Sequence, residues 1–229
     1  MRDGRGLIIV SDTMDHNLKK LINAGEGQQL DFKYCVSDSR KIARTLSAFS
    51  NSHGGRILIG VRDNGSIAGI RSEEEIYMVD TAACLYCRPE ITYTIKQHTT
   101  EGKTILEVEV MKGSKRPYQV KDESGRWLAY FRHDDQNLLA NRVLLQVWRK
   151  EEKKQGVMVK FSKAENALMD YLKKNGSVTL SKFKKISKIS SYRAEAILAN
   201  LILFKILKMR ASEKGFSYEL AGKPDQDAL

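Results

Sequence analysis

Three acidic residues in the first half of the chain have types and spacing that could support metal-assisted phosphodiester chemistry. Glu26 and Asp31 flank the entry to an expected strand, and Asp63 follows a second, strongly apolar strand. Lys33 lies two residues after Asp31 and is therefore expected on the same strand face. Carboxylates at strand ends hold a divalent cation against a phosphate, and a lysine offsets their mutual repulsion. Spacing alone leaves two interpretations open, a metal-dependent site or three solvated surface acids.

A second group of candidate residues is basic and lies near the C-terminal end. These residues surround the start of a helix expected from Ser190 or Ser191 through Phe204. In a helix-turn-helix such a helix enters the major groove, and the preceding helix meets phosphates. The expected helix has few Arg and Asn, so phosphate contacts should dominate over base readout. The candidates are Lys182, Lys184, Lys185, Lys188, Tyr192 and Arg193.

The elements around this basic group predict a small winged-helix domain over residues 161–221, followed by a tail over 222–229. Apolar residues at helical spacing and capping serines predict three short helices, which begin after Ser162, Ser181 and Ser190. Two strands, 206–211 and 216–220, then flank a hairpin turn. Three helices followed by a hairpin are typical of a winged helix. A protein-docking or dimerisation module of the same fold remains an alternative.

The first 150 residues alternate between strand and helix patterns. One expected strand precedes and another follows a helix that ends near Asn51, and a later hairpin turns at Glu101 and Gly102. This mixture predicts an α+β fold with a mixed sheet in a domain over residues 1–150, joined by a linker over 151–160. The expected helices are 15–24, 38–51, 72–79 and 137–150, and the expected strands are 30–34, 56–61, 91–97, 104–110, 117–120 and 127–132.

The charge of the chain is unevenly distributed between these two parts. The net charge is +11, and residues 151–229 hold 16 Lys and Arg against 9 Asp and Glu. The smaller part therefore carries most of the positive excess. A basic module attracts polyanions through phosphate contacts and counterion release. A solubilising surface is the alternative explanation.

Composition also bears on the compartment. No apolar run approaches the ~18 residues that a membrane span needs, and the apolar stretch near the N-terminus is shorter than a signal-peptide core. The three cysteines are too few and of odd number for a disulfide framework. We therefore expect a cytoplasmic protein without membrane association.

Two segments of the chain resemble the signature of the Schlafen-type AlbA domain. Residues 26–33 (EGQQLDFK) and 48–65 (AFSNSHGGRILIGVRDNG) match its conserved order of an acid, a second acid with lysine, and an A-F-x-N-x-x-G-G block. Later pieces around Pro117 and around Tyr130 to Asn137 are similar to the family's less specific motifs. The resemblance spans about residues 14–150. It implies an α+β domain that binds nucleic acid.

The resemblance also bears on chemistry. Bacterial members are often labelled transcriptional regulators, and many carry a C-terminal winged helix. Vertebrate relatives include metal-dependent endoribonucleases whose three acids fall, by motif position, on Glu26, Asp31 and Asp63. Here Asp31 stands in place of a Glu, and Arg62 in place of an Asp. Those nucleases use a duplicated arrangement, whereas this chain has one copy, so a nuclease groove would require a homodimer.

Together these observations predict a nucleic-acid-binding protein, of DNA or RNA, that acts as a bacterial-type transcriptional regulator and forms a homodimer. Lys33, Arg62 and Arg132 are the expected contacts of the first domain with nucleic acid. A continuous apolar run, residues 201–204, is more than one helix face can bury and suggests a dimer interface. The alternatives are an endoribonuclease that uses Mg²⁺ or Mn²⁺, and a protein–protein adaptor. No cofactor is expected outside the nuclease alternative.

Overall fold

The computed structural model describes residues 7–11, 16–152, 162–212 and 215–222, which fall into two compact units. The first unit ends at Ala140 and the second begins at Asn141. Within the described ranges, no helix has both the length and the apolar composition required to cross a membrane. Each unit has a buried core of its own.

A five-stranded mixed sheet forms the centre of the first unit, with the strand order β1-β5-β6-β3-β2. β1 pairs with β5 and β2 with β3 in parallel, whereas β5 with β6 and β6 with β3 are antiparallel. The α+β class with a mixed sheet, expected from the sequence, is therefore confirmed. The strands are β1 (Leu7–Ser11), β2 (Leu30–Lys33), β3 (Gly55–Ile59), β5 (Tyr93–Thr100) and β6 (Lys103–Val110).

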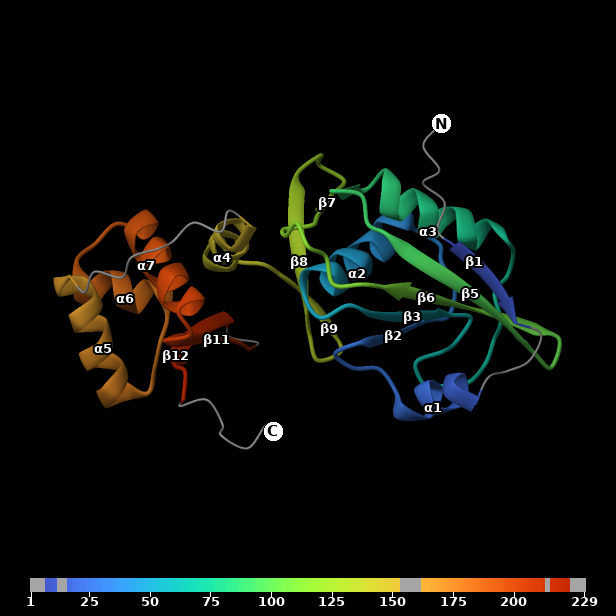
Figure 1. The fold of residues 1–229 in the computed structure, drawn as a ribbon, viewed down its shortest axis with the longest axis horizontal. Coiled ribbons are helices and arrows are strands. Elements are labelled where there is room, and N and C mark those ends of the chain that lie inside the picture. Colours follow the sequence, from blue (N-terminus) through green and yellow to red (C-terminus); the bar gives the residue numbers. More distant parts are fainter. Residues whose placement is uncertain (1–6, 12–15, 153–161, 213–214, 223–229) are drawn as a thin grey trace. The chain divides into compact units, whose positions relative to one another are not determined.

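Helices cover both faces of this sheet (Figure 1). On one face α2 and α3 pack with Ile57 and Ile59 of β3, and on the other Leu18 of α1 packs with Phe32 and Leu58. Because both faces of β3 are buried from Ile57 to Ile59, these three residues are all apolar and do not alternate with polar ones. The helices are α1 (His16–Ala24), α2 (Ser39–Asn51) and α3 (Glu74–Cys84).

A second, four-stranded sheet of order β4-β7-β8-β9 completes the first unit. β8 packs against α2, and so places the later motif pieces beside the A-F-x-N-x-x-G-G block. The strands are β4 (Cys87–Arg88), β7 (Gln119–Lys121), β8 (Trp127–His133) and β9 (Gln136–Leu139).

The helix expected over residues 137–150 was wrong in its first part. Asp134 adopts a positive φ of 52°, and the chain turns back so that Asn137 pairs with Arg132 across β8 and β9. The helix α4 (Arg142–Glu152) begins only after Asn141, whose side-chain oxygen accepts a hydrogen bond from Leu144 N at 2.8 Å. The side chain of Asn137 bonds to Arg132 of the neighbouring strand and to Thr45 of the distant α2, and helical periodicity does not reveal these contacts.

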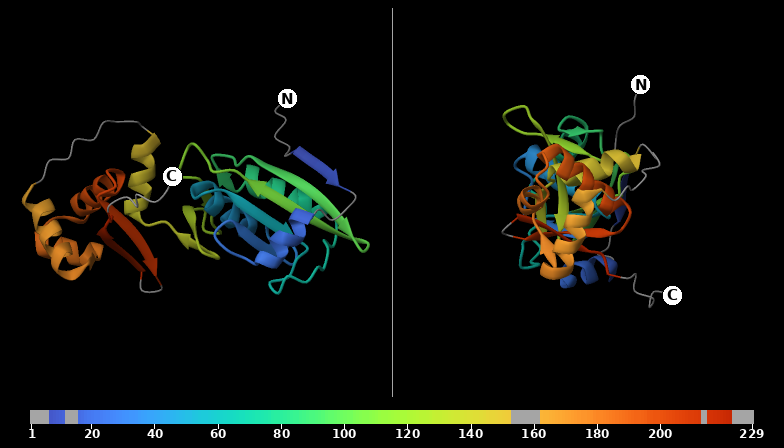
Figure 2. Two further views of the ribbon diagram at one scale, coloured as in Figure 1. Left: turned by 60° about the horizontal axis from the view of Figure 1, so that its bottom comes forward. Right: turned by 90° about the vertical axis from the view of Figure 1, so that its left-hand side faces the viewer.

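The described residues of the second unit form four helices and a three-stranded sheet of order β10-β12-β11 (Figure 2). Val143 and Val147 of α4 share one core with Leu168, Phe183 and Leu198 from the three following helices. The elements after α4 are α5 (Lys163–Asn175), β10 (Ser177–Val178), α6 (Leu180–Ser187), α7 (Ser191–Leu203), β11 (Leu207–Ser212) and β12 (Gly215–Leu220).

The division between the units differs from the boundary expected at residue 150. Val143 and Val147 pack into the second core, so α4 belongs to the second unit and the structure divides the chain before it. Of the expected linker, residues 151 and 152 end α4, and residues 153–160 lie outside the described ranges. The same holds for most of the expected tail, residues 223–229.

Candidate functional site

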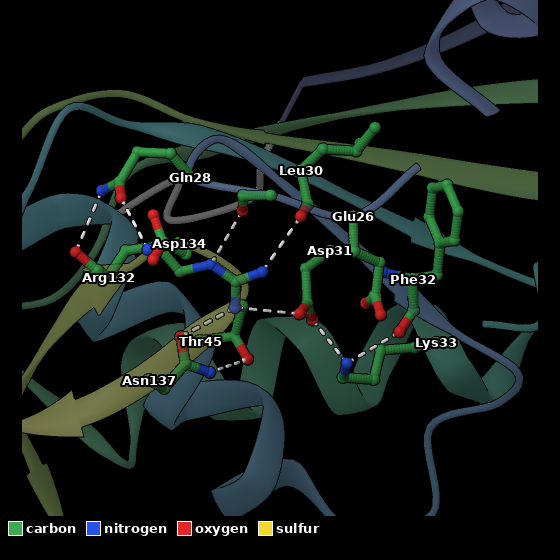
Figure 3. Close-up of polar contacts among 11 residues, drawn as sticks. Glu26, Gln28, Leu30, Asp31, Phe32, Lys33, Thr45, Arg132, Asp134 and Asn137 are labelled. Atoms are coloured by element: carbon green, nitrogen blue, oxygen red, sulfur yellow. Dashed lines mark hydrogen bonds and ion pairs between the residues drawn. The ribbon is translucent and has the colours of Figure 1, made fainter. Parts of the chain in front are cut away.

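The centre of the first unit holds a buried ion pair between Arg132 of β8 and Asp31 of β2 (Figure 3). Arg132 Nη1 lies 3.0 Å from Asp31 Oδ1. The arginine side chain is 0% exposed and the aspartate side chain 4%. Both charges are therefore removed from water, where each would be costly without its partner.

Backbone and side-chain oxygens accept the other hydrogen bonds of this guanidinium. Nε donates to the carbonyl of Gly27 at 3.1 Å, Nη2 to that of Leu30 at 3.0 Å, and Nη1 also to Asn137 Oδ1 at 3.0 Å. Its carbon lies 5.2 Å from the centre of the Phe49 ring. Arg132, expected from the sequence to contact nucleic acid, is thus enclosed in the core and has no surface to offer a phosphate.

The second oxygen of Asp31 faces Lys33, which confirms that the two side chains share a strand face. Lys33 Nζ lies 2.6 Å from Asp31 Oδ2, but its hydrogen bond goes to the Phe32 carbonyl at 2.7 Å. Oδ2 is consequently buried and paired by charge without receiving a well-directed hydrogen bond. The Lys33 side chain is 34% exposed, so its charge is shared between Asp31 and the solvent.

The other two expected acids do not join this pair in a ligand set. Glu26 Oε1 accepts a hydrogen bond from Phe32 N at 2.7 Å, and Asp63 is exposed in the turn that follows β3. Within the described ranges, no three His, Cys, Asp or Glu side chains are grouped closely enough to hold a metal ion. Asp31 also already faces two cations. These residues therefore do not fit Mg²⁺ or Mn²⁺ in this structure.

Asn51, the asparagine of the A-F-x-N-x-x-G-G block, joins α2 to the second sheet. Its Nδ2 lies 2.8 Å from the carbonyls of Tyr118 and Tyr130, and its Oδ1 accepts from Tyr118 N at 2.8 Å. Asn51 is 2% exposed. The most specific motif of the sequence thus contains a structural asparagine that positions β7 and β8, a role that spacing alone could not reveal.

The two glycines that follow in this block allow close packing. Gly54 has a φ of +77°, and a Cβ there would lie 2.7 Å from the Val110 carbonyl oxygen. A Cβ on Gly55 would lie 2.7 Å from the Phe49 ring. The two glycines therefore allow β3 to pack closely between α2 and β6.

The expected basic residues of the second unit lie around α6 and the start of α7. Thr179 caps α6 in place of the expected Ser181, and Ser190 caps α7 by accepting from Arg193 N at 3.3 Å. Tyr192 is 79% exposed. Lys182, Lys185, Lys188 and Arg193 are exposed, and Lys184 is partly exposed.

The apolar run expected to form an interface is largely used within the second unit. Leu201 is 1% exposed, and Ile202 and Leu203 pack against the core in part. Phe204, at 41% exposure, is the residue of this run that faces solvent. The surface available for a partner is therefore smaller than the sequence suggests.

The fold and the motif residues together define the first unit as an AlbA-type α+β domain. The family model described as Schlafen, AlbA_2 matches residues 26–141. The chain belongs to this Schlafen AlbA_2 family. No curated protein matches the sequence.

Two solved structures are similar to the chain in part. The DIP2311 protein from Corynebacterium diphtheriae is 16% identical, with a TM-score of 0.41 over 85% of this chain and 34% of that protein. The N-terminal domain of a RecG-related protein from Nitrosomonas europaea is 20% identical, with a TM-score of 0.38 over 53% of this chain and 93% of that domain. This chain thus covers about a third of the C. diphtheriae protein.

Proposed function

We propose that the chain is a nucleic-acid-binding protein that acts as a transcriptional regulator, with a winged helix as its second unit. Membership of the Schlafen AlbA_2 family supports a nucleic-acid-related function. The order α5-β10-α6-α7-β11-β12 is the order of a winged helix, in which α7 is the helix that enters a groove. Cys35, Cys84 and Cys87 form no disulfide in the described part of the chain, which agrees with a cytoplasmic location.

The exposed cations of α6 and of the first turn of α7 carry this proposal. Lys182, Lys185, Lys188 and Arg193 are exposed, and none of them makes an ion pair with a carboxylate among the described residues. Tyr192 stands beside them with 79% of its surface exposed. Cations without a carboxylate partner around an exposed aromatic ring suit a phosphate backbone. The turn between the two helices would therefore face the nucleic acid.

Base-specific contacts are expected to be few. Tyr192 and Arg193 are exposed at the start of α7, whereas the buried side of the helix is mostly apolar. Glu195 is 6% exposed and is therefore not available to contact a base. Amide and guanidinium groups, which pair bidentately with bases, are scarce on this helix. We therefore propose binding that depends mainly on phosphates, with modest sequence preference.

The test is a salt titration of binding to labelled duplex DNA and to labelled RNA. Each lysine or arginine that no longer neutralises a phosphate should reduce the log–log salt slope by about 0.9 on duplex DNA. The variant Lys182→Ala/Lys185→Ala/Lys188→Ala/Arg193→Ala should bind more weakly and with a shallower slope. A variant with four exposed lysines of the first unit replaced serves as the charge-matched control. Unchanged affinity in the first variant would support the adaptor alternative, in which this surface docks a protein.

A homodimer is part of the proposal, because a single winged helix reads one half-site. Phe204 is the exposed member of the apolar run and the candidate contact. Light scattering of the full chain at tens of micromolar should give twice the 26.0 kDa mass of one chain, and Phe204→Ser should shift it toward the monomer. A wild-type monomer under these conditions would remove the dimer from the proposal.

A further inference from the structure

Two arginines from different segments of the first unit converge on one exposed tyrosine. The guanidinium carbon of Arg62 lies 5.0 Å from the centre of the Tyr34 ring, and that of Arg71 also lies 5.0 Å from it. Tyr34 follows β2, Arg62 follows β3, and Arg71 precedes α3. The tyrosine is 40% exposed, and both arginines are exposed. We call these three residues the Tyr34 cluster.

Buried contacts hold the segments that carry the cluster in fixed positions. Glu75, 4% exposed, accepts hydrogen bonds from Val36 N at 2.6 Å and from Arg71 N at 2.7 Å. It thereby ties the chain after Tyr34 to the backbone of Arg71. On the other side, the carbonyl of Gly60 accepts from Gly69 N at 2.9 Å, which joins the end of β3 to the segment before Arg71.

Gly60 allows the end of β3 to lie close to the segment before Arg71. Its φ is +94°, and a Cβ there would lie 2.9 Å from the carbonyl carbon of Gly69. Its own N–H donates to the carbonyl of Lys33, the residue before Tyr34, at 2.8 Å. All three segments are therefore joined through main-chain hydrogen bonds, and the cluster needs little reorganisation before it binds a ligand.

The cluster has an excess of positive charge. Among the described residues, neither Arg62 nor Arg71 forms an ion pair with a carboxylate. Both oxygens of the nearby Glu75 accept from backbone N–H groups, and its negative charge acts on Arg71 from there. Hydrogen bonding and charge from Arg71, with a further contribution from Arg62, lower the pKa of the Tyr34 phenol. Two like charges beside one ring repel each other, and a bound anion would relieve this repulsion.

We propose that the Tyr34 cluster binds a phosphate group of a nucleotide chain, with Arg62 and Arg71 as its ligands and Tyr34 as the residue that positions them. Guanidinium groups match the oxygens of a phosphate in pairs, which favours a phosphate over a single-point anion. The inference deepens the proposed function and rests on it for the identity of the polymer. It adds a contact in the first unit, separate from the surface around α6 and α7.

Arg71 and Tyr34 were not among the residues expected from the sequence, although Arg62 was. Asp63, which neighbours Arg62, is exposed, and its negative charge would oppose a bound phosphate. The variant Asp63→Ala should therefore bind nucleic acid as well as the wild type or more tightly. Weaker binding by Asp63→Ala would contradict a phosphate site at the cluster.

The experiment compares the full-length wild type with Arg62→Gln/Arg71→Gln, using fluorescence anisotropy of labelled single-stranded RNA and labelled duplex DNA. Removing two charge-assisted hydrogen-bonding groups should weaken binding about tenfold or more. Lys115→Gln/Lys121→Gln removes the same charge from exposed positions of the same unit and should change affinity far less. Unchanged melting temperatures would show that the variants fold, and Arg62→Lys/Arg71→Lys, which keeps the charge, should recover part of the affinity.

A second measurement tests the Tyr34 cluster separately from the proposed nucleic-acid-binding function. The Nε–Hε NMR signals of Arg62 and Arg71 are followed while inorganic phosphate, a nucleoside monophosphate or a short oligonucleotide is added. If the oligonucleotide binds and neither the signals nor the double variant respond, the Tyr34 cluster is overturned and the proposed function stands. If no nucleic acid binds but the signals shift with a monophosphate, the proposed function fails and the cluster is a site for small phosphates. Shifts with none of the probes would overturn the cluster as a phosphate site.

Discussion

Arg132 and Asp31 form a buried ion pair, with Nη1 3.0 Å from Oδ1, although 101 positions separate them in the chain. The pair joins β8 of the second sheet to β2 of the central sheet. Two backbone carbonyls and Asn137 accept the other hydrogen bonds of the guanidinium. Asp31 was expected to bind a metal and Arg132 to bind nucleic acid. In the structure the two residues instead join the two sheets to each other.

We predict that Arg132→Ala destabilises the first unit by about 3–5 kcal/mol, because it leaves Asp31 buried without its full compensation. Arg132→Lys keeps the charge but cannot reach all four acceptors, so it should fall between the wild type and the alanine variant. Urea unfolding followed by Trp127 fluorescence in a Trp148→Phe background reports on this unit alone.

The matched control is Arg126→Ala. Arg126 pairs with Asp122 at 2.9 Å, but its side chain is 73% exposed, so its removal should change the unfolding midpoint little. An Arg132→Ala variant that is as stable as this control would show that the buried pair does not hold the two sheets together.

We predict that the wild type does not cleave structured RNA in the presence of Mg²⁺ or Mn²⁺. Asp31 faces Arg132 and Lys33, Glu26 accepts from a backbone N–H, and Asp63 is exposed. The melting temperature should respond to neither metal, and Asp63→Ala should have a stability within about 0.5 kcal/mol of the wild type, as surface substitutions usually do.

Metal-dependent cleavage that disappears in Asp63→Ala would contradict this prediction. It would require the three acids to converge in a state with RNA bound, and it would restore the endoribonuclease alternative. The same incubation with Lys115→Ala controls for a contaminating nuclease, because that variant should behave as the wild type does.

We predict that Asn51→Ala costs the first unit at least about 2 kcal/mol, because it leaves buried backbone groups of Tyr118 and Tyr130 without their partner. Asn64→Ala is the control, since Asn64 is exposed and its side chain accepts a hydrogen bond from Ser66 N at 3.0 Å. Both are measured by the Trp127 signal in urea. Equal midpoints for the two variants would contradict the role assigned to the motif asparagine.

Local patterns in the sequence were sufficient for most elements of the first unit. The apolar run of β3, the helix of the motif and the β5–β6 hairpin follow from periodicity and turn residues, and the structure contains all three. Residues 137–140 were assigned to a helix because their periodicity fits one. Their strand conformation depends on Asn137, whose side chain bonds to Arg132 and Thr45.

The candidate site was harder to predict, because its geometry depends on contacts between distant segments. The shared strand face of Asp31 and Lys33 follows from their spacing and is confirmed. The burial of Arg132 depends on β8 lying beside α2 and on the turn before β2, and no local pattern reveals this. The Tyr34 cluster likewise combines three segments that come together only in the folded chain.

Alkaline pH should destabilise the second unit through Tyr218. This tyrosine is 1% exposed, and burial raises the pKa of its phenol to about 12, while a hydrogen bond from Asn141 Nδ2 at 3.2 Å acts in the opposite direction. In the unfolded chain the phenol has its ordinary pKa of about 10. The folded state therefore holds the proton more tightly. Its stabilisation is fully present below pH ~10 and is lost as the pH rises through ~12.

The stability of the second unit should accordingly fall by up to about 1.4 kcal/mol per pH unit in this window, and Tyr218→Phe should remove that part of the slope. Lys150 acts with the opposite sign, because burial lowers its pKa and its stabilisation grows as the pH rises toward its ordinary value. Comparing the two proteins cancels this contribution, since both contain Lys150. Urea unfolding between pH 9 and pH 11, followed by the fluorescence of the buried Trp148 in a Trp127→Phe background, measures the difference. If the wild type and Tyr218→Phe lose stability in parallel over this range, the phenol does not titrate with folding, and another group must account for the alkaline loss.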